Sequence, residues 1–133
     1  AGVPLRTDPA GVALCGASAG ALISLYGAAR RPDVFGTALC LSMPWIVGNQ
    51  KFVKGFVSSV PGPESGLRIW VDHGTADYDA GYEKGSVVAD REFQKLGYRW
   101  PQLVSNRYIG WGHSEAAWAA RLPEVLEWWL RGA

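Results

Sequence analysis

The stretch Val12-Ala13-Leu14-Cys15-Gly16-Ala17-Ser18-Ala19-Gly20 decides the fold of this 133-residue chain. A short apolar run leads into the pattern G-x-S-x-G at residues 16–20, and helix-forming residues follow as far as position 30. A serine on a sharp turn between a strand and a helix needs glycines beside it, because larger side chains would clash with both elements. The turn would also put the Ser18 hydroxyl at a helix N-terminus, where free N–H groups favour negative charge. The stretch therefore predicts a nucleophile elbow, and a turn of small residues packed for structure alone is the alternative.

Beyond this turn, short apolar runs alternate with helical periods. Strands are expected at residues 12–15, 36–41, 67–71 and 103–109, and helices at residues 19–30, 49–58, 83–96 and 114–130. Ser114 is the expected N-cap of the last helix, and Pro123 predicts a kink there, or a division into two helices near Arg121. Strand followed by helix, four times over, predicts a parallel sheet with helices on both faces. We expect one α/β domain over residues 1–133.

Composition excludes several classes of protein. Hydrophobic residues make up 48% of the chain and charged residues 19%, so a packed core is available and a disordered chain is excluded. Thirteen basic and twelve acidic residues give a net charge of +1, which leaves no excess of positive charge for a nucleic-acid backbone. Cys15 and Cys40 lie in apolar runs and are expected to be small buried residues. No spacing of Cys and His resembles a zinc site, so neither a metal nor another cofactor is expected.

Residues 9–29 carry no charge and are numerous enough to cross a bilayer, but glycine, serine and alanine keep their hydrophobicity modest. A buried strand followed by a buried helix is the better interpretation, and no membrane contact is expected. The chain starts at Ala1, with neither an initiator Met nor the pattern of a signal peptide. We expect a processed product or a fragment, with the cytoplasm as its default location.

A serine nucleophile needs a base, and the base needs a carboxylate to orient it. The chain has two histidines: His73 follows the third expected strand directly, and His113 lies in the loop after the fourth. Three acid candidates cluster after the third strand: Asp72, Asp77 and Asp79. Because the carboxyl ends of parallel strands meet at one edge of a sheet, Ser18, an aspartate and His113 are expected to meet there.

The chain order Ser, Asp, His is that of the α/β-hydrolases, and three segments make the likeness specific. They are Cys15-Gly16-Ala17-Ser18-Ala19-Gly20 with Arg31-Pro32-Asp33-Val34-Phe35 downstream, His73-Gly74-Thr75-Ala76-Asp77, and Gly112-His113-Ser114-Glu115-Ala116-Ala117-Trp118. From about residue 6 to residue 131 the chain resembles the α/β-hydrolase group of esterase D-like, enterochelin esterase-like and feruloyl esterase-like proteins. The third segment is the most specific, since this group often has Gly-His-Asn-Glu followed by Trp.

The resemblance implies a serine carboxylesterase that hydrolyses small carboxylic esters through an acyl-enzyme. Matched by position, Ser18 is the nucleophile, His113 the base and Asp77 the acid, with the Ala19 N–H as an oxyanion donor. Asp79 is the second choice for the acid.

Several neighbours of these residues receive other roles. Asp72 is expected to be a structural residue at a strand end, and His73 a polar packing residue. Trp111 and Trp45 are expected to line the substrate pocket, although core packing is the simpler interpretation of each tryptophan taken alone.

Members of this group are about twice as long, with several strands before the elbow strand. The chain matches their C-terminal half only, so we expect a truncated α/β-hydrolase fold. The absent half includes the loop that donates the second oxyanion N–H. Loss of one such donor typically costs about 10² to 10³ in rate, so weak activity is expected.

Truncation would also leave an open, apolar edge on the strand from Val12 to Cys15, and such an edge readily pairs with another strand. Two copies could join these edges across a two-fold axis, giving a homodimer with a continuous sheet. An N-terminal partner chain could cover the edge instead, or the chain could be an unstable fragment.

Two other functions fit the same sequence. One is a non-catalytic half-hydrolase that serves assembly or ligand binding, which the missing oxyanion donor favours. The other is acyl transfer to an acceptor other than water, which shares the acyl-enzyme and which the sequence does not separate from hydrolysis.

Overall fold

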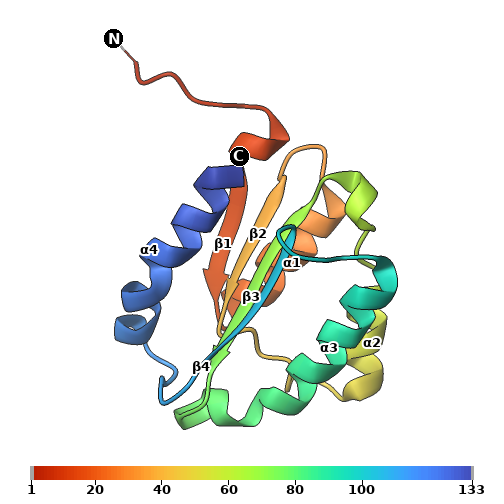
Figure 1. Ribbon diagram of the computed structural model, residues 1–133, viewed down its shortest axis with the longest axis vertical. Coiled ribbons are helices and arrows are strands. Elements are labelled where there is room, and N and C mark those ends of the chain that lie inside the picture. The colour runs from red at the N-terminus through yellow and green to blue at the C-terminus, as the bar shows by residue number, and fades with distance from the viewer. Residues whose placement is uncertain (1, 133) are drawn as a thin grey trace.

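A computed structural model of the protein describes residues 2–132. Its centre is a parallel sheet whose spatial order β1-β2-β3-β4 is also the chain order. The strands are β1 (Ala13–Ala17), β2 (Thr37–Leu41), β3 (Arg68–Gly74) and β4 (Leu103–Tyr108). All four therefore end at the same edge of the sheet (Figure 1), which confirms the predicted parallel arrangement.

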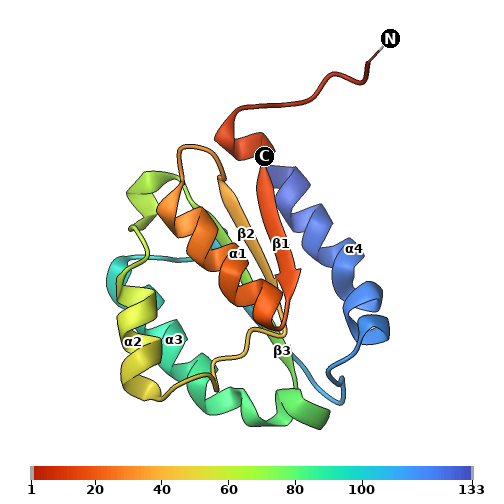
Figure 2. The same cartoon turned by 180° about the vertical axis from the view of Figure 1, so that it is seen from behind.

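Helices cover both faces of the sheet, as the two views in Figures 1 and 2 show. One face carries α1 (Ala19–Arg30), α2 (Gln50–Ser58) and α3 (Glu83–Leu96), and the other carries α4 (Glu115–Gly132). Successive side chains of a strand point to opposite faces, so each strand supplies two cores. In β2, Ala38 and Cys40 join the core under α1 to α3, while Leu39 and Leu41 pack with Val125 of α4.

The predicted elements are confirmed, and their ends differ by a few residues. Asn49 caps α2 by accepting a hydrogen bond from the Phe52 amide (3.0 Å), and the Ser114 hydroxyl accepts one from the Ala117 amide (3.2 Å). Of the two outcomes expected at Pro123, the division into two helices is wrong, because α4 is one helix with Pro123 inside it. Packing of its buried face against the sheet outweighs the hydrogen bond that a proline removes.

Strand β1 lies at one edge of the described sheet and pairs with β2 alone. Its central residue corrects one prediction, since Cys15 is exposed, whereas Cys40 is buried as expected. Cys15 shares a face of the sheet with Ala13 and Ala17, which pack only partly against the α4 core. The core under α4 centres on β2, β3 and β4, so the middle of β1 is left open on this face.

Within residues 2–132, no helix has both the length and the apolar content needed to cross a bilayer. The uncharged stretch at residues 9–29 instead forms β1 and α1. This confirms the interpretation of that stretch as a strand followed by a helix.

Candidate active site

Ser18 occupies the turn between β1 and α1 in a strained backbone conformation, with φ 56° and ψ −125°. Such conformations cost a non-glycine residue about 1–3 kcal/mol and persist only where the surroundings enforce them. The Ser18 amide donates to the carbonyl oxygen of Leu41 at the end of β2 (3.0 Å), which helps to fix the turn. The Ser18 side chain does not cap α1. Ala19 is the first residue of α1, where N–H groups have no acceptor within the helix.

The two glycines of the G-x-S-x-G pattern differ in the space around them. A Cβ placed on Gly16 would lie 2.3 Å from the carbonyl oxygen of Gly20, because the first turn of α1 crosses directly over the end of β1. A Cβ on Gly20 would have no heavy atom within 4 Å. Of these two glycines, only Gly16 is required by the close approach of strand and helix.

We expect Gly16→Ala to lower the free energy of unfolding by about 3 kcal/mol, because the new methyl group would collide with backbone that cannot rotate away. Gly20→Ala is the matched control and should raise stability by up to about 1 kcal/mol, as alanine does inside helices. Urea unfolding followed by circular dichroism measures both. Equal stability of the two variants would contradict the proposed contact.

His113 lies in the loop between β4 and α4, and its imidazole contacts a buried carboxylate. Its Nδ1 is 2.6 Å from Oδ1 of Asp79, a residue with no exposed surface. An ionised carboxylate can only accept hydrogen bonds, so Nδ1 carries the proton and Nε2 is left as the acceptor. The second carboxylate oxygen of Asp79 accepts from the Gly74 amide (2.7 Å) and from the Ser42 hydroxyl (2.6 Å).

The carboxylate that contacts His113 is Asp79, the second choice for the acid, and not the expected Asp77. Both residues belong to the short 3₁₀ helix η3 (Asp77–Gly81), which starts with Asp77 at φ 52°. This turn directs the side chain of Asp79 inward and leaves Asp77 exposed. The carboxylate of Asp77 lies against Gly112, where an added Cβ would meet it at 1.9 Å. Asp77 therefore borders the backbone beside His113.

Backbone hydrogen bonds fasten the histidine loop to the loop after β3. The carbonyl oxygen of Trp111 accepts from the amides of Thr75 and Ala76, both at 3.0 Å. The hydroxyl of Thr75 accepts from the Gly110 amide at 2.7 Å. These contacts hold the acid and the histidine, which lie 34 residues apart in sequence, in one fixed arrangement.

Three aromatic rings surround the imidazole of His113. Tyr78, Tyr82 and Trp118 present their rings nearly perpendicular to it, with centroid distances of 5.7, 6.1 and 5.0 Å. Burial, together with the charge of Asp79, raises the pKa of Tyr82, so this phenol stays neutral at physiological pH. The His113 side chain keeps 16% of its surface exposed, so one part of the ring faces outward.

Two further residues singled out from the sequence, Asp72 and His73, have structural surroundings. Asp72 is buried and pairs with Arg121 (2.8 Å), which confirms its structural role. His73 is also buried, with Nδ1 2.7 Å from the carbonyl oxygen of Gly74, so its expected packing role is confirmed.

The two predicted pocket tryptophans differ in their surroundings. Trp45 is 4% exposed and packs edge-on against Phe56 and Phe93 in the core under α1 to α3, which agrees with the simpler interpretation of core packing, and its role in a substrate pocket stays a prediction. Trp111 is 37% exposed and packs beside Tyr108. A role for Trp111 in substrate binding stays a prediction.

Sequence reasoning missed Ser42, which donates to Asp79 directly after β2. Ser42 has φ 45°, and with Ser18 and Asp77 it completes the set of non-glycine residues with positive φ in residues 2–132. Each of the three follows a strand of the sheet at its carboxyl end. The rule that placed the other candidates at strand ends could therefore also have found Ser42.

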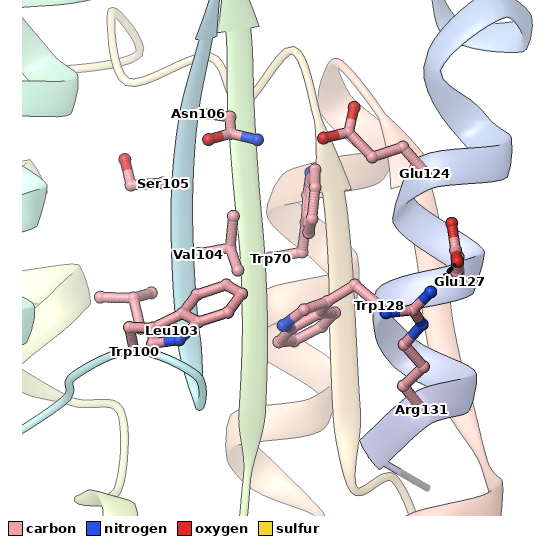
Figure 3. Close-up of a pocket in the computed structure, with 10 residues that line it drawn as sticks. All are labelled: Trp70, Trp100, Leu103, Val104, Ser105, Asn106, Glu124, Glu127, Trp128 and Arg131. Carbon is pink, nitrogen blue, oxygen red and sulfur yellow. Dashed lines mark hydrogen bonds and ion pairs between the residues drawn. The ribbon is translucent and has the colours of Figure 1, made fainter.

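A separate cavity lies between β4 and α4, on the face of the sheet opposite α3. It has a volume of about 470 Å³ and is lined by Trp70, Trp100, Leu103, Val104, Ser105, Asn106, Glu124, Glu127, Trp128 and Arg131 (Figure 3). None of Ser18, Asp79 or His113 reaches it. Residues 2–132 also hold no group of three acidic, histidine or cysteine side chains suited to a metal ion.

Comparison with known proteins agrees with this architecture. The family model described as "Putative esterase" matches residues 3–129. The ferric enterobactin esterase of Salmonella typhimurium superposes with a TM-score of 0.69 at 20% identity, over 94% of this chain and 31% of its own. The enterobactin esterase of Shigella flexneri gives 0.73 at 17% identity, over 94% and 32%. A ferulic acid esterase gives 0.66 at 17% identity, over 96% and 53%.

No curated protein matches the chain. The chain spans between about a third and a half of the length of the solved esterases that it resembles. Their identities to it are low, so the superpositions establish the fold, while the family match covers nearly every residue. The chain belongs to this esterase family and carries part of its α/β-hydrolase fold.

Proposed function

We propose that this chain carries the catalytic residues of a serine carboxylesterase, with Ser18 as nucleophile, His113 as general base and Asp79 as the acid that orients the base. The observation that carries the proposal is the buried contact of 2.6 Å between Asp79 and His113 at the sheet edge where Ser18 follows β1. A carboxylate on Nδ1 leaves Nε2 as the acceptor that a serine proton requires.

The steps follow from these positions. Ser18 Oγ attacks the ester carbonyl carbon while His113 Nε2 takes its proton, giving a tetrahedral oxyanion. His113 then returns the proton to the departing alcohol, and an acyl-enzyme remains on Ser18. Water attacks the acyl carbon, His113 takes the proton of that water, and the carboxylic acid leaves as Oγ recovers a proton. The Ala19 N–H at the start of α1 is positioned in sequence to donate to the oxyanion.

Substrates in this proposal are small carboxylic esters, which require few pocket contacts. The chain spans between about a third and a half of the solved esterases that it resembles, and we infer that the second oxyanion donor and part of the pocket wall lie in the portion that it does not span. We therefore expect slow turnover by the chain alone. We further propose that the open edge of β1 is covered either by a second copy of the chain or by an N-terminal partner.

A covalent probe tests the nucleophile independently of turnover. A p-nitrophenyl alkylphosphonate should transfer its alkylphosphonyl group to Ser18 Oγ and release p-nitrophenol, giving one adduct per chain that peptide mass mapping assigns to residue 18. Prior heating of the protein should abolish the reaction, since only the folded site activates the hydroxyl. Absence of an adduct from the folded protein, or adducts spread over several serines, would contradict the proposal.

A non-catalytic role is the second candidate, favoured by the share of the fold that this chain spans. In that case the chain would bind a partner or a ligand through a site inherited from esterases. A folded protein that neither reacts with the phosphonate nor hydrolyses p-nitrophenyl acetate would support this second function.

A further inference from the structure

The hydroxyl of Ser42 has every hydrogen-bonding position occupied. Its oxygen lies 2.8 Å from Trp118 Nε1, 2.9 Å from Arg121 Nη2 and 2.6 Å from Asp79 Oδ2. An indole N–H and a guanidinium can only donate, so they take the two lone pairs of the oxygen. The one proton of the hydroxyl therefore has to point at Asp79. The contacts thus fix Ser42 as a donor to this carboxylate.

The donors to Ser42 are themselves fixed. Arg121 is 2% exposed, and it donates from Nε (3.1 Å) and Nη2 (2.8 Å) to Oδ1 of Asp72. The other oxygen of Asp72 accepts from the indole of Trp70 (2.9 Å). The amide of Ser42 also donates to Asp72 Oδ1 (2.8 Å), which helps to hold Ser42 at its positive φ. The pair of Asp72 and Arg121 thus anchors Ser42 through its backbone and its side chain.

Trp118 links this network to the imidazole. Its indole N–H donates to the Ser42 hydroxyl. Its ring lies nearly perpendicular to the imidazole of His113, with the two ring centroids 5.0 Å apart. Trp118 and Arg121 lie three residues apart, on the same face of α4. Helix α4 therefore acts on both members of the pair formed by Asp79 and His113. Its Trp118 ring packs against His113, and its Trp118 and Arg121 bind Ser42, which in turn binds Asp79.

We propose that Ser42, Trp118 and Arg121 are positioning residues, which lock Asp79 in the one orientation that keeps the proton of His113 on Nδ1. This inference rests on the roles proposed above for Asp79 and His113. Without Ser42, Oδ2 of Asp79 would keep the Gly74 amide as its single donor, and the carboxylate that binds His113 through Oδ1 would rotate more freely about its side-chain torsion. The Ser42 hydroxyl supplies the second donor and removes this freedom.

The test measures the tautomer of His113 in the resting protein. Ring ¹⁵N chemical shifts, recorded at a pH where the imidazole is neutral, report the fraction of molecules with the proton on Nδ1. We expect this fraction to be near unity in the wild type and to fall toward that of a solvent-exposed histidine side chain in Ser42→Ala. Trp118→Phe keeps an aromatic ring but removes the N–H, and we expect a smaller change in the same direction.

Two features of the chain serve as controls. His73 is the only other histidine, and its Nδ1 donates to a backbone carbonyl, so its ¹⁵N shifts should stay constant in every variant. Trp129→Phe is the matched control for Trp118→Phe, since it makes the same exchange on the same helix. The buried indole nitrogen of Trp129 has no hydrogen-bond partner within residues 2–132, so this exchange removes no hydrogen bond. This variant should keep the wild-type tautomer of His113.

Kinetics give a second readout. We expect Ser42→Ala to lower kcat for p-nitrophenyl acetate about tenfold, the value of one hydrogen bond to a charged group, with KM little changed. The tautomer measurement decides between the outcomes, because it requires no catalytic turnover. If the fraction of His113 with its proton on Nδ1 is unchanged in folded Ser42→Ala and in folded Trp118→Phe, the positioning role is overturned. A wild type that has the expected tautomer but no esterase activity would refute the proposed function and leave the positioning network standing.

Discussion

Ser18→Ala should abolish ester hydrolysis by this chain, with a fall in kcat/KM for p-nitrophenyl acetate of at least about 10⁴-fold relative to the wild type. The substitution removes only the oxygen that would form the acyl-enzyme. The strained turn at φ 56° should persist, because hydrogen bonds of the backbone and the fit of Gly16 under α1 hold it. Initial rates, corrected for spontaneous hydrolysis of the ester, measure the effect.

The matched control for this prediction is Ser24→Ala. Ser24 lies in α1, the helix that follows Ser18, is buried, and uses its hydroxyl to donate to the carbonyl oxygen of Gly20 (2.7 Å). Its replacement should leave kcat/KM of the folded protein within a factor of about two, since it removes one buried hydrogen bond but not the reacting group. Similar activity of Ser18→Ala and the wild type would show that any hydrolysis comes from a different residue.

Asp79→Asn should lower kcat/KM by about 10⁴-fold, while Asp77→Asn should change it only a few-fold. An asparagine at position 79 would turn its carbonyl oxygen toward the two donors, the Gly74 amide and the Ser42 hydroxyl. Its NH₂ group would then face His113 Nδ1 and donate to it, which forces the proton onto Nε2. With the proton on Nε2, the imidazole could no longer take the proton of Ser18.

Asp77→Asn is a suitable partner for this comparison, because asparagine is among the residues that best tolerate the positive φ found at position 77. The residue is exposed and does not bind His113, so both the fold and the tautomer should survive. Near-ultraviolet circular dichroism would check that both variants are folded. A larger loss in Asp77→Asn than in Asp79→Asn would return the acid role to Asp77.

The choice between these two aspartates shows where motif matching reaches its limit. Asp77 stands where the resemblance to the esterase group places the acid, directly after His73-Gly74-Thr75-Ala76. Only Tyr78 separates it from Asp79, and within this tight turn the side chains of Asp77 and Asp79 point in different directions. The direction depends on the positive φ at Asp77 and on the donors from Gly74 and Ser42, none of which has a local sequence signal.

The amino-acid sequence by itself determined the alternation of strands and helices, the parallel sheet, and the placement of Ser18 and His113 at its carboxyl edge. These features follow from local patterns: the period of apolar residues fixes each element, and the strand-helix order leaves few topologies open. The continuity of α4 past Pro123, the burial of Trp45 and the exposure of Cys15 were decided by packing between elements distant in the chain.

Tertiary structure alone decided the surroundings of the acid. Asp79 is held by Ser42 from the end of β2, by Gly74 from β3, and by His113 from the loop after β4. Buried polar groups must find partners wherever the fold brings them, and the partners of this carboxylate are spread over 72 positions, from residue 42 to residue 113. A network of that span becomes visible only once the strands have been placed side by side.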